Sequence, residues 1–154
     1  MLTGGYDKLR LAAAALATAL LIAPVAAADP TTLITEHEAN LPADNSVLRS
    51  GPERGPEVVA VSPPADTGMI QSPFDFQVKF RPHGGTQIDL DSLKVVYKRI
   101  PAIDLTARVK PFLHPDGFNV PSAAVPAGPH RIIVSIKDST GHEGQADIRF
   151  EVAK

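Results

Sequence analysis

The sequence predicts an all-β protein whose main part, residues 57–154, is an antiparallel β-sandwich of about seven strands. Apolar and polar residues alternate with a period of two in several short runs, which is the pattern of strands that bury one face. Turns rich in proline and glycine separate these runs at short intervals. No window of 11 residues in this part has the period of an amphipathic helix, so a sheet packed on a sheet is favoured over a sheet covered by helices.

Residues 1–28 have the features of a cleaved signal peptide. A basic start leads into the apolar run Leu11 to Ala23, and the alanines at 26–28 form the small-residue pattern that signal peptidase accepts. The alternative is an uncleaved anchor, but Pro24 and the alanine run end the segment before the roughly 20 apolar residues that span a bilayer. We therefore expect cleavage before Asp29 and a periplasmic or secreted product without stable membrane insertion.

Residues 29–56 differ in composition from the rest of the chain. Four prolines and several charges interrupt apolar residues that are too sparse to build a buried face. Residues 35–41 are expected to form one or two helical turns at most. The sequence therefore predicts a flexible leader, which would serve either as a spacer or as an arm that docks a partner.

The first predicted strands are short. The apolar run at 58–61 stops at the turn Ser62-Pro63-Pro64-Ala65-Asp66-Thr67-Gly68, because prolines interrupt a strand ladder. Residues 74–81 alternate most clearly and place three phenylalanines on one face, which predicts a strand of the core. After a turn, residues 88–98 form the next predicted strand.

Residues 103–109 alternate again and predict a further strand. Residues 118–120 are expected to form a short strand, and residues 121–129 a proline-rich crossing. Residues 126–152 read as two antiparallel strands joined by a short polar loop. A hairpin alone is only marginally stable in water, so its apolar face is expected to pack on the phenylalanine-rich strand.

Several turn and strand motifs of residues 57–154 occur in a characteristic order. They are the acidic start of Ile88 to Val95, the short run Ile103 to Thr106, Asp116-Gly117-Phe118, the Pro-Ala-Gly-Pro turn within Val125 to Ile132, and the loop Asp138-Ser139-Thr140-Gly141. This order resembles the bacterial immunoglobulin-like domains of exported proteins. The resemblance implies an immunoglobulin-like β-sandwich that acts as a binding or structural accessory to an envelope or secreted protein partner. The chain has no cysteine and no tryptophan, which places it with the disulfide-free bacterial modules.

A second resemblance implies an alternative function. Ser62 to Gly68 and Asp138 to His142 are similar to an early Ser-Pro-Ala-Asp-Gly turn and a late Asp-Gly-His loop of the CopC-like periplasmic copper carriers. That family also uses a histidine at its mature N-terminus, whereas Asp29 would begin this chain and His37 is its first histidine. The resemblance implies a copper carrier or a metal-homeostasis protein.

Composition and motifs disfavour several other functions. The net charge of −2 argues against a dedicated nucleic-acid binder, which usually shows a strong basic excess. The serines lie in turns without a Gly-x-Ser-x-Gly elbow, and no paired carboxylates flank a recognisable cleft. We therefore expect a non-enzymatic protein with no resident cofactor, whose stability comes from packing alone because no disulfide can form.

Histidines are the candidate transition-metal ligands in a chain without cysteine. His142 with Asp138 or Glu143 would offer copper or zinc a site in the last loop, and the alternative is that these are solvated loop residues. Asp89, Asp91 and Asp104 are a weaker candidate set for calcium. His130, at the start of the penultimate strand, is expected to be structural, with its polar tip bonded to a nearby turn.

A basic set is the candidate partner-binding surface. On the predicted strands its members fall side by side; they are Lys94, Lys98, Arg99, Arg108 and Lys110. Such a patch would attract an anionic glycan, a lipid headgroup or an acidic protein surface. The alternative is that these charges protect an edge strand from unwanted pairing.

Overall fold

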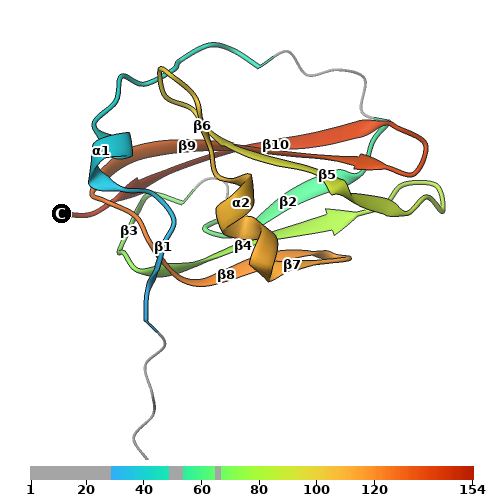
Figure 1. Cartoon of the computed structure of the whole chain (residues 1–154), viewed down its shortest axis with the longest axis horizontal. Coiled ribbons are helices and arrows are strands. Elements are labelled where there is room, and N and C mark those ends of the chain that lie inside the picture. The colour runs from blue at the N-terminus through green and yellow to red at the C-terminus, as the bar shows by residue number, and fades with distance from the viewer. Residues whose placement is uncertain (1–28, 49–53, 65–66) are drawn as a thin grey trace, which may run out of the picture.

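The computed structural model describes residues 29–48, 54–64 and 67–154, which form a two-layer β-sandwich (Figure 1). The predicted signal peptide lies outside the described residues. One sheet contains β1 (Thr31–Thr32), β8 (Gly117–Ala124), β4 (Phe74–Arg81) and β2 (Glu57–Ser62) in that order, with β7 (Leu113–His114) paired to β8. The other contains β3 (Met69–Ile70), β10 (Glu143–Val152), β9 (Gly128–Asp138), β5 (Ile88–Tyr97) and β6 (Ile103–Asp104). No helix in these residues is long and apolar enough to cross a membrane.

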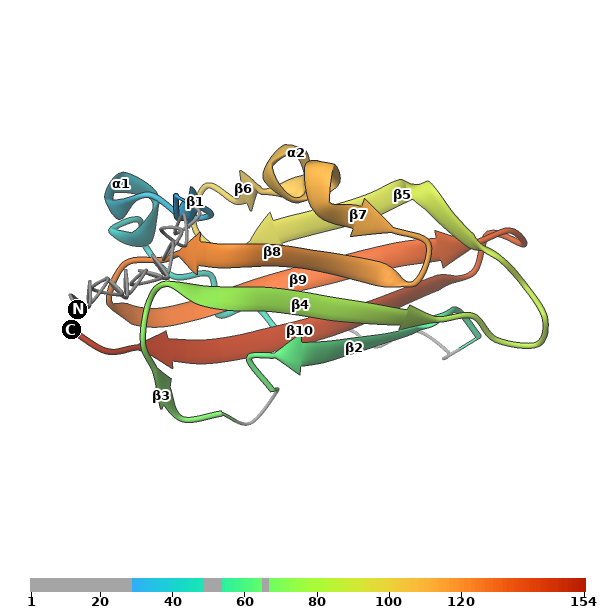
Figure 2. The same ribbon diagram turned by 90° about the horizontal axis from the view of Figure 1, so that it is seen from below.

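The strand order is that of an immunoglobulin-like sandwich. The first strand of the domain is split: β2 pairs with β4 in one sheet, and β3 then pairs in parallel with β10 in the other. The chain crosses back from β3 to β4, and it crosses again from β4 to β5, from β6 to β7 and from β8 to β9, which gives a Greek-key arrangement. The predicted fold class is therefore confirmed. The turn from β8 to β9 lies at one end of the sandwich and the loop from β9 to β10 at the other (Figure 2).

The core lies between the phenylalanine-rich strand β4 and the β9–β10 hairpin, which the sequence predicts to pack on each other. In the β9–β10 hairpin, Ile132 pairs with Ile148, and both side chains are buried. Phe76 is fully buried on the inner face of β4. The rings of Phe74 and Phe150 meet edge to face with their centroids 5.4 Å apart, so the phenylalanine-rich strand and the hairpin do pack on each other.

The predicted strand at 103–109 is wrong beyond Asp104. The chain instead forms α2 (Thr106–Val109) and then the 3₁₀ turn η1 (Lys110–Phe112). The Asp104 carboxylate accepts a hydrogen bond from the Thr106 N–H at 2.8 Å, which starts the turn. Leu105 and Val109 are both fully buried and lie four residues apart, so the apolar positions satisfy a helical period as well as an alternating one.

The predicted crossing at 121–129 is shorter than expected, because β8 continues through Pro121 to Ala124. The register between β4 and β8 shifts between Phe74 and Phe76, and this irregularity absorbs the proline. Ser122 has a φ of +48°, and its N–H donates to the Asp75 carboxylate at 3.0 Å. A proline at such an irregularity does not end a strand.

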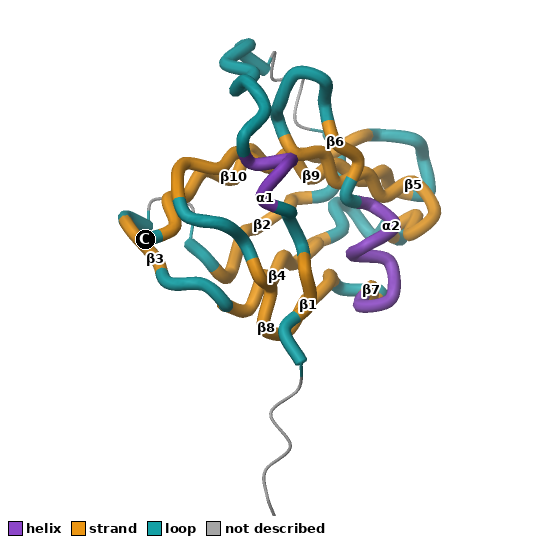
Figure 3. The backbone as a smooth tube through the Cα atoms, turned by 60° about the vertical axis from the view of Figure 1, so that its left-hand side comes forward, coloured by secondary structure: helices purple, strands orange, loops and turns teal. Residues whose placement is uncertain are grey.

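The predicted flexible leader is wrong for residues 29–48, here called the strap, which pack along the sandwich; residues 49–53 lie outside the described part. Leu33 is fully buried and Ile34 is 2% exposed, and the Leu33 N–H donates to the Ala124 carbonyl at 3.0 Å. A capping box between Thr35 and Glu38 opens the short helix α1 (Glu36–Ala39). Figure 3 shows α1 and α2 as separate short turns and β1 beside β8. Two adjacent apolar residues in irregular chain fill the sandwich edge without producing a periodic pattern.

Candidate functional site

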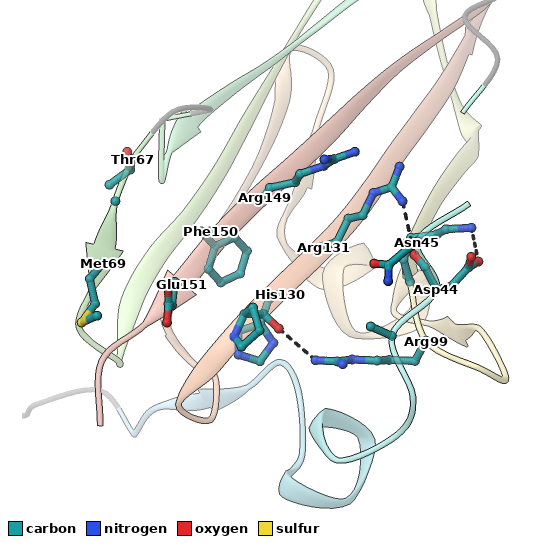
Figure 4. A pocket seen from close by; sticks show the side chains of 14 residues that line it. Asp44, Asn45, Thr67, Met69, Arg99, His130, Arg131, Arg149, Phe150 and Glu151 are labelled. Carbon is teal, nitrogen blue, oxygen red and sulfur yellow. Dashed lines mark hydrogen bonds and ion pairs between the residues drawn. The ribbon is translucent and has the colours of Figure 1, made fainter. Parts of the chain in front are cut away.

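A pocket of about 580 Å³ opens at the end of the sandwich where the strap passes the ends of β9 and β10 (Figure 4). Its lining comes from the strap, the start of β3, the residues after β5, and the facing ends of β9 and β10. The residues are Ala43, Asp44, Asn45, Thr67, Gly68, Met69, Lys98, Arg99, Pro129, His130, Arg131, Arg149, Phe150 and Glu151. Four of them are cationic, namely Lys98, Arg99, Arg131 and Arg149.

Ion pairs and carbonyl contacts hold the strap wall of this pocket. Lys98 pairs with Asp44, and its donated hydrogen bond keeps the pKa of that carboxyl well below its ordinary value. The guanidinium of Arg131 donates to the main-chain carbonyls of Asp44 at 3.2 Å and Ser46 at 2.8 Å. Its other edge binds the Asp147 carboxylate through Nε at 2.9 Å and Nη2 at 2.8 Å. One arginine therefore joins the strap to the β9–β10 sheet.

Arg99 is the most buried cation of the pocket, with 8% of its surface exposed. Its Nε donates to the Tyr97 hydroxyl at 2.8 Å, Nη1 to the Leu41 carbonyl at 3.2 Å, and Nη2 to the Pro129 carbonyl at 2.9 Å. The guanidinium carbon also lies 4.9 Å from the centre of the Tyr97 ring, within range of a cation–π contact. Arg99 thus ties the strap to the start of β9.

His130 closes this end of the sandwich and is structural, as predicted. Its Nε2 lies 2.8 Å from the Pro126 carbonyl and its Nδ1 lies 2.8 Å from the Tyr97 hydroxyl. The imidazole stacks on Phe150 with the ring centroids 5.5 Å apart. Burial lowers the pKa of His130, and the nearby Arg99 charge lowers it further.

The five predicted partner-binding residues do not share two neighbouring strands. Lys94 lies on β5, but Arg108 lies in α2 and Lys110 begins η1. Arg99 is buried, and Lys98 is paired with the strap. Of the five, Lys94 and Lys110 remain exposed, so the predicted shared outward face is wrong. Whether the exposed pair meets a partner stays a prediction.

Arg108 instead anchors the strap at its other end. Its guanidinium binds both carboxylate oxygens of Glu38, at 2.7 and 2.8 Å, and also donates to the Leu33 carbonyl at 2.7 Å. The hydrogen bonds from Arg108 are the main cause that lowers the pKa of Glu38 to about 2. The strap therefore has one charged anchor on α2 and others at the pocket.

The predicted metal ligands lie in the β9–β10 loop, at the far end of the sandwich from the pocket (Figure 2). Asp138 is 3% exposed, and its Oδ1 accepts from the Thr140 N–H at 2.9 Å, the Thr140 hydroxyl at 2.7 Å and the His142 N–H at 3.0 Å. The Thr140 hydroxyl bond is the main cause that lowers the pKa of Asp138. Its Oδ2 is buried without a hydrogen-bond partner among the described residues, 3.8 Å from His142 Nδ1.

The structure brings Asp138 and His142 together but leaves Glu143 exposed at the start of β10. Within residues 29–48, 54–64 and 67–154 no group of three or more His, Cys, Asp or Glu side chains is placed to hold a metal ion. The candidate calcium carboxylates have local roles instead: Asp89 accepts from the Asp91 N–H at 3.2 Å, and Asp104 from Thr106. The copper or zinc site stays a prediction.

Sequence reasoning missed Arg131, Arg149 and Asp147, although the hairpin register contained the signal. Arg131 and Arg149 lie directly opposite each other across β9 and β10, which places two like charges side by side. Asp147 binds both, at 2.8 Å in each case. Two opposed arginines with an acid two residues away predict such a bridge once the register is assigned.

No protein-family model and no curated protein sequence matches the chain. Some solved structures are similar at low identity. CopC from Methylosinus trichosporium OB3b is 14% identical with a TM-score of 0.44, and the match covers 63% of this chain and 92% of CopC. An engineered protein is 15% identical with a TM-score of 0.43, over 64% of this chain and 20% of that one. The fibronectin(III)-like modules of Clostridium thermocellum CbhA are 17% identical with a TM-score of 0.36, over 62% and 45%.

These TM-scores are low. The fold assignment therefore rests on the strand order and the split first strand, both of which the structure gives directly.

Proposed function

We propose that this chain is an exported, non-catalytic immunoglobulin-like module that binds a protein of the envelope or a secreted protein, and that it does so at the pocket end of the sandwich. The observation that carries the proposal is the pocket itself, whose walls come from segments far apart in the sequence and are joined by Arg99 and Arg131. A preformed concave site with fixed polar groups is the usual form of a site for a small ligand, and such a pocket can also seat one anchoring side chain of a protein partner.

The side chains of the pocket support binding more than catalysis. Both ring nitrogens of His130 are already bonded, so this histidine has no lone pair left to act as a general base. Arg99 and Arg131 are held by several hydrogen bonds each, which preorganises their charges for recognition.

Photo-crosslinking tests this location. A benzoylphenylalanine replaces Asn45 at the pocket rim in one variant and the exposed Asn119 on the opposite sheet in the other. Each purified variant is irradiated with envelope and secreted fractions of the source cell. We expect a discrete adduct from the Asn45 variant and none from the Asn119 variant. Equal adducts from both, or none from either, would contradict the proposed site.

One observation favours a second candidate, a metal carrier. The Oδ2 of Asp138, which has no hydrogen-bond partner in the part of the chain that the structure describes, and the half-exposed His142 side chain place one oxygen and one nitrogen ligand atom at the same loop. Zinc and copper sites usually take about four ligands, so these two residues do not complete a site, and other donors would have to come from water or a partner.

A titration separates the two functions. Cu(II) or Zn(II) is added to the mature chain while the histidine ring resonances are followed. Tight binding that shifts His142 and is lost in His142→Gln would support the carrier. An absence of binding at micromolar metal removes it.

A further inference from the structure

Arg99 carries a buried charge whose partners are all neutral. Its three hydrogen-bond acceptors are the Tyr97 hydroxyl and the carbonyls of Leu41 and Pro129. No carboxylate pairs with it among residues 29–48, 54–64 and 67–154. Burying an ionised group without a counter-ion is costly, so an uncompensated guanidinium in the wall of a pocket marks a place where an anion would be stabilised.

The other cations of the pocket each have a carboxylate. Lys98 pairs with Asp44, while Arg131 and Arg149 share Asp147. Counting the exposed Glu151 as well, four cations meet three carboxylates, and one positive charge is left over. Figure 4 shows Arg99 extending toward His130, with Arg131 and Arg149 on the neighbouring strands.

Donors remain available for a ligand. A guanidinium has five N–H groups, and the bonds described above use three of those on Arg99. The Arg149 side chain is 66% exposed, and its bonds to Asp147 come from Nε and Nη2, so Nη1 makes no hydrogen bond to the described residues. Met69, which is 67% exposed, provides an apolar rim.

We propose that this pocket binds a carboxylate group carried by an acidic side chain of the protein partner. The single excess positive charge matches a monoanion. A phosphate dianion would bring one more negative charge than the pocket can neutralise, next to the carboxylates of Asp44 and Glu151. Arg149 makes the first contact at the rim, and Arg99 provides the charge behind it. This inference rests on the proposed function, because it names the chemistry that the binding site recognises.

The test uses the mature chain and two capped peptides, Gly-Glu-Gly and Gly-Gln-Gly, with acetate and inorganic phosphate as separate probes. Arginine side-chain N–H resonances report binding. We expect the glutamate peptide and acetate to shift Arg99 and Arg149 with millimolar affinity, and the glutamine peptide to leave both unchanged. Stronger binding of acetate than of the glutamate peptide would assign the pocket to a free acid and overturn the peptide source. Preference for phosphate would overturn the carboxylate assignment.

A matched pair of variants places the site. Arg149→Gln removes the rim contact, and Arg81→Gln alters an arginine that is equally exposed, at 66%, and ion-paired to Glu57 on the other sheet. We expect Arg149→Gln to weaken the binding of the glutamate peptide about tenfold, which corresponds to the loss of one charged hydrogen bond. Arg81→Gln should leave the affinity for the peptide unchanged. Equal effects from both variants would overturn the proposal.

The crosslinking and peptide-binding results together distinguish a failure of this inference from a failure of the proposed protein-binding function. Suppose that the glutamate peptide does not bind the unsubstituted chain, while the crosslink at position 45 still forms in the Arg149→Gln variant. The carboxylate specificity is then wrong, and the proposed protein-binding site stands. If the crosslink at position 45 never forms while the glutamate peptide binds in an Arg149-dependent way, the protein-binding function fails and the anion site stands.

Discussion

The hydrogen bonds around His130 have one consistent direction. Arg99 can only donate, so the Tyr97 hydroxyl accepts from it and gives its own proton to His130 Nδ1. The Pro126 carbonyl can only accept, which assigns a proton to Nε2 and leaves the ring neutral. A second proton on this ring would turn Nδ1 into a donor that faces the donor of Tyr97.

This geometry predicts a pH dependence of stability. Burial and Arg99 lower the pKa of His130 in the folded state below its ordinary value of 6.5, so the unfolded chain takes up the proton first as pH falls. Stability should be complete above about pH 6.5 and decline below it, by at most about 1.4 kcal/mol per pH unit. Urea unfolding from about pH 7.5 to pH 5 measures this slope. His130→Gln should flatten the slope, and an unchanged slope would contradict the assignment.

Phe76 predicts the cost of a core defect. Its side chain is fully buried and packs on Phe118 with the ring centroids 5.4 Å apart, so Phe76→Ala should lower the free energy of unfolding by about 3–5 kcal/mol. The exposed Lys79 of the same strand is the control, and Lys79→Ala should change stability by about 0.5 kcal/mol or less. Similar losses in both variants would show that the inner face of β4 is misassigned. Asp75 is exposed on the same strand but is not a suitable control, because its carboxylate accepts a hydrogen bond from the Ser122 N–H and its removal would break that bond.

At the scale of elements, the β9–β10 hairpin and the start of β2 approach each other closely. A Cβ on Gly144 would lie 1.7 Å from the Pro56 carbonyl oxygen, and one on Gly55 would lie 2.3 Å from the Glu143 main chain. Such contacts admit only glycine, so both glycines set how the hairpin and the segment before β2 meet.

Gly144→Ala tests this contact. The methyl group would force the hairpin and Pro56 apart, and we expect a loss of about 1–3 kcal/mol in thermal or urea unfolding. Gly68 is the matched control, since a Cβ there would meet nothing within 4 Å and its φ is not in the left-handed region. If the two alanine variants are equally stable, the close approach does not exist in solution.

At the scale of the whole molecule, the strap links the two sheets. It pairs with β8 of one sheet through β1 and is held by Arg131 of the other sheet through the Asp44 and Ser46 carbonyls. Between these ends, Leu33 and Ile34 enter the core and Glu38 binds Arg108. The segment is therefore part of the sandwich and helps to build the pocket.

The Glu38–Arg108 pair predicts how firmly the strap is held. Glu38→Gln should destabilise the protein by about 1–2 kcal/mol, with Arg108 one-third exposed and partly screened by solvent. The pKa of Glu38, lowered to about 2, means that this contribution is present above about pH 4.5 and is lost as pH falls toward 2. A double-mutant cycle with Arg108→Gln should show positive coupling, whereas strictly additive losses would mean that the pair does not interact.

The sequence by itself determined the elements whose information is local. Alternation along β4 and β9–β10 located the core strands and their buried faces, since a strand repeats its environment every second residue. Turn residues separated most strands. The position of His130 at the start of a strand predicted a bond from its ring to a nearby turn, and its hydrogen bond to the Pro126 carbonyl confirms this. These features need only neighbours in the chain.

The tertiary structure alone decided the features that depend on distant partners. Leu33 and Ile34 are isolated apolar residues in the sequence, and they are buried where the strap pairs with the end of β8. Leu105 and Val109 fit two periods equally well, and burial of both on one helical face selected the helix. Arg99 looked like a surface cation, yet the strap and the start of β9 enclose it, and no carboxylate pairs with it among the described residues. Spacing along the chain carries no information on which distant group will supply a charge, a carbonyl or a cavity, so the pocket could be found only after the strap was in place.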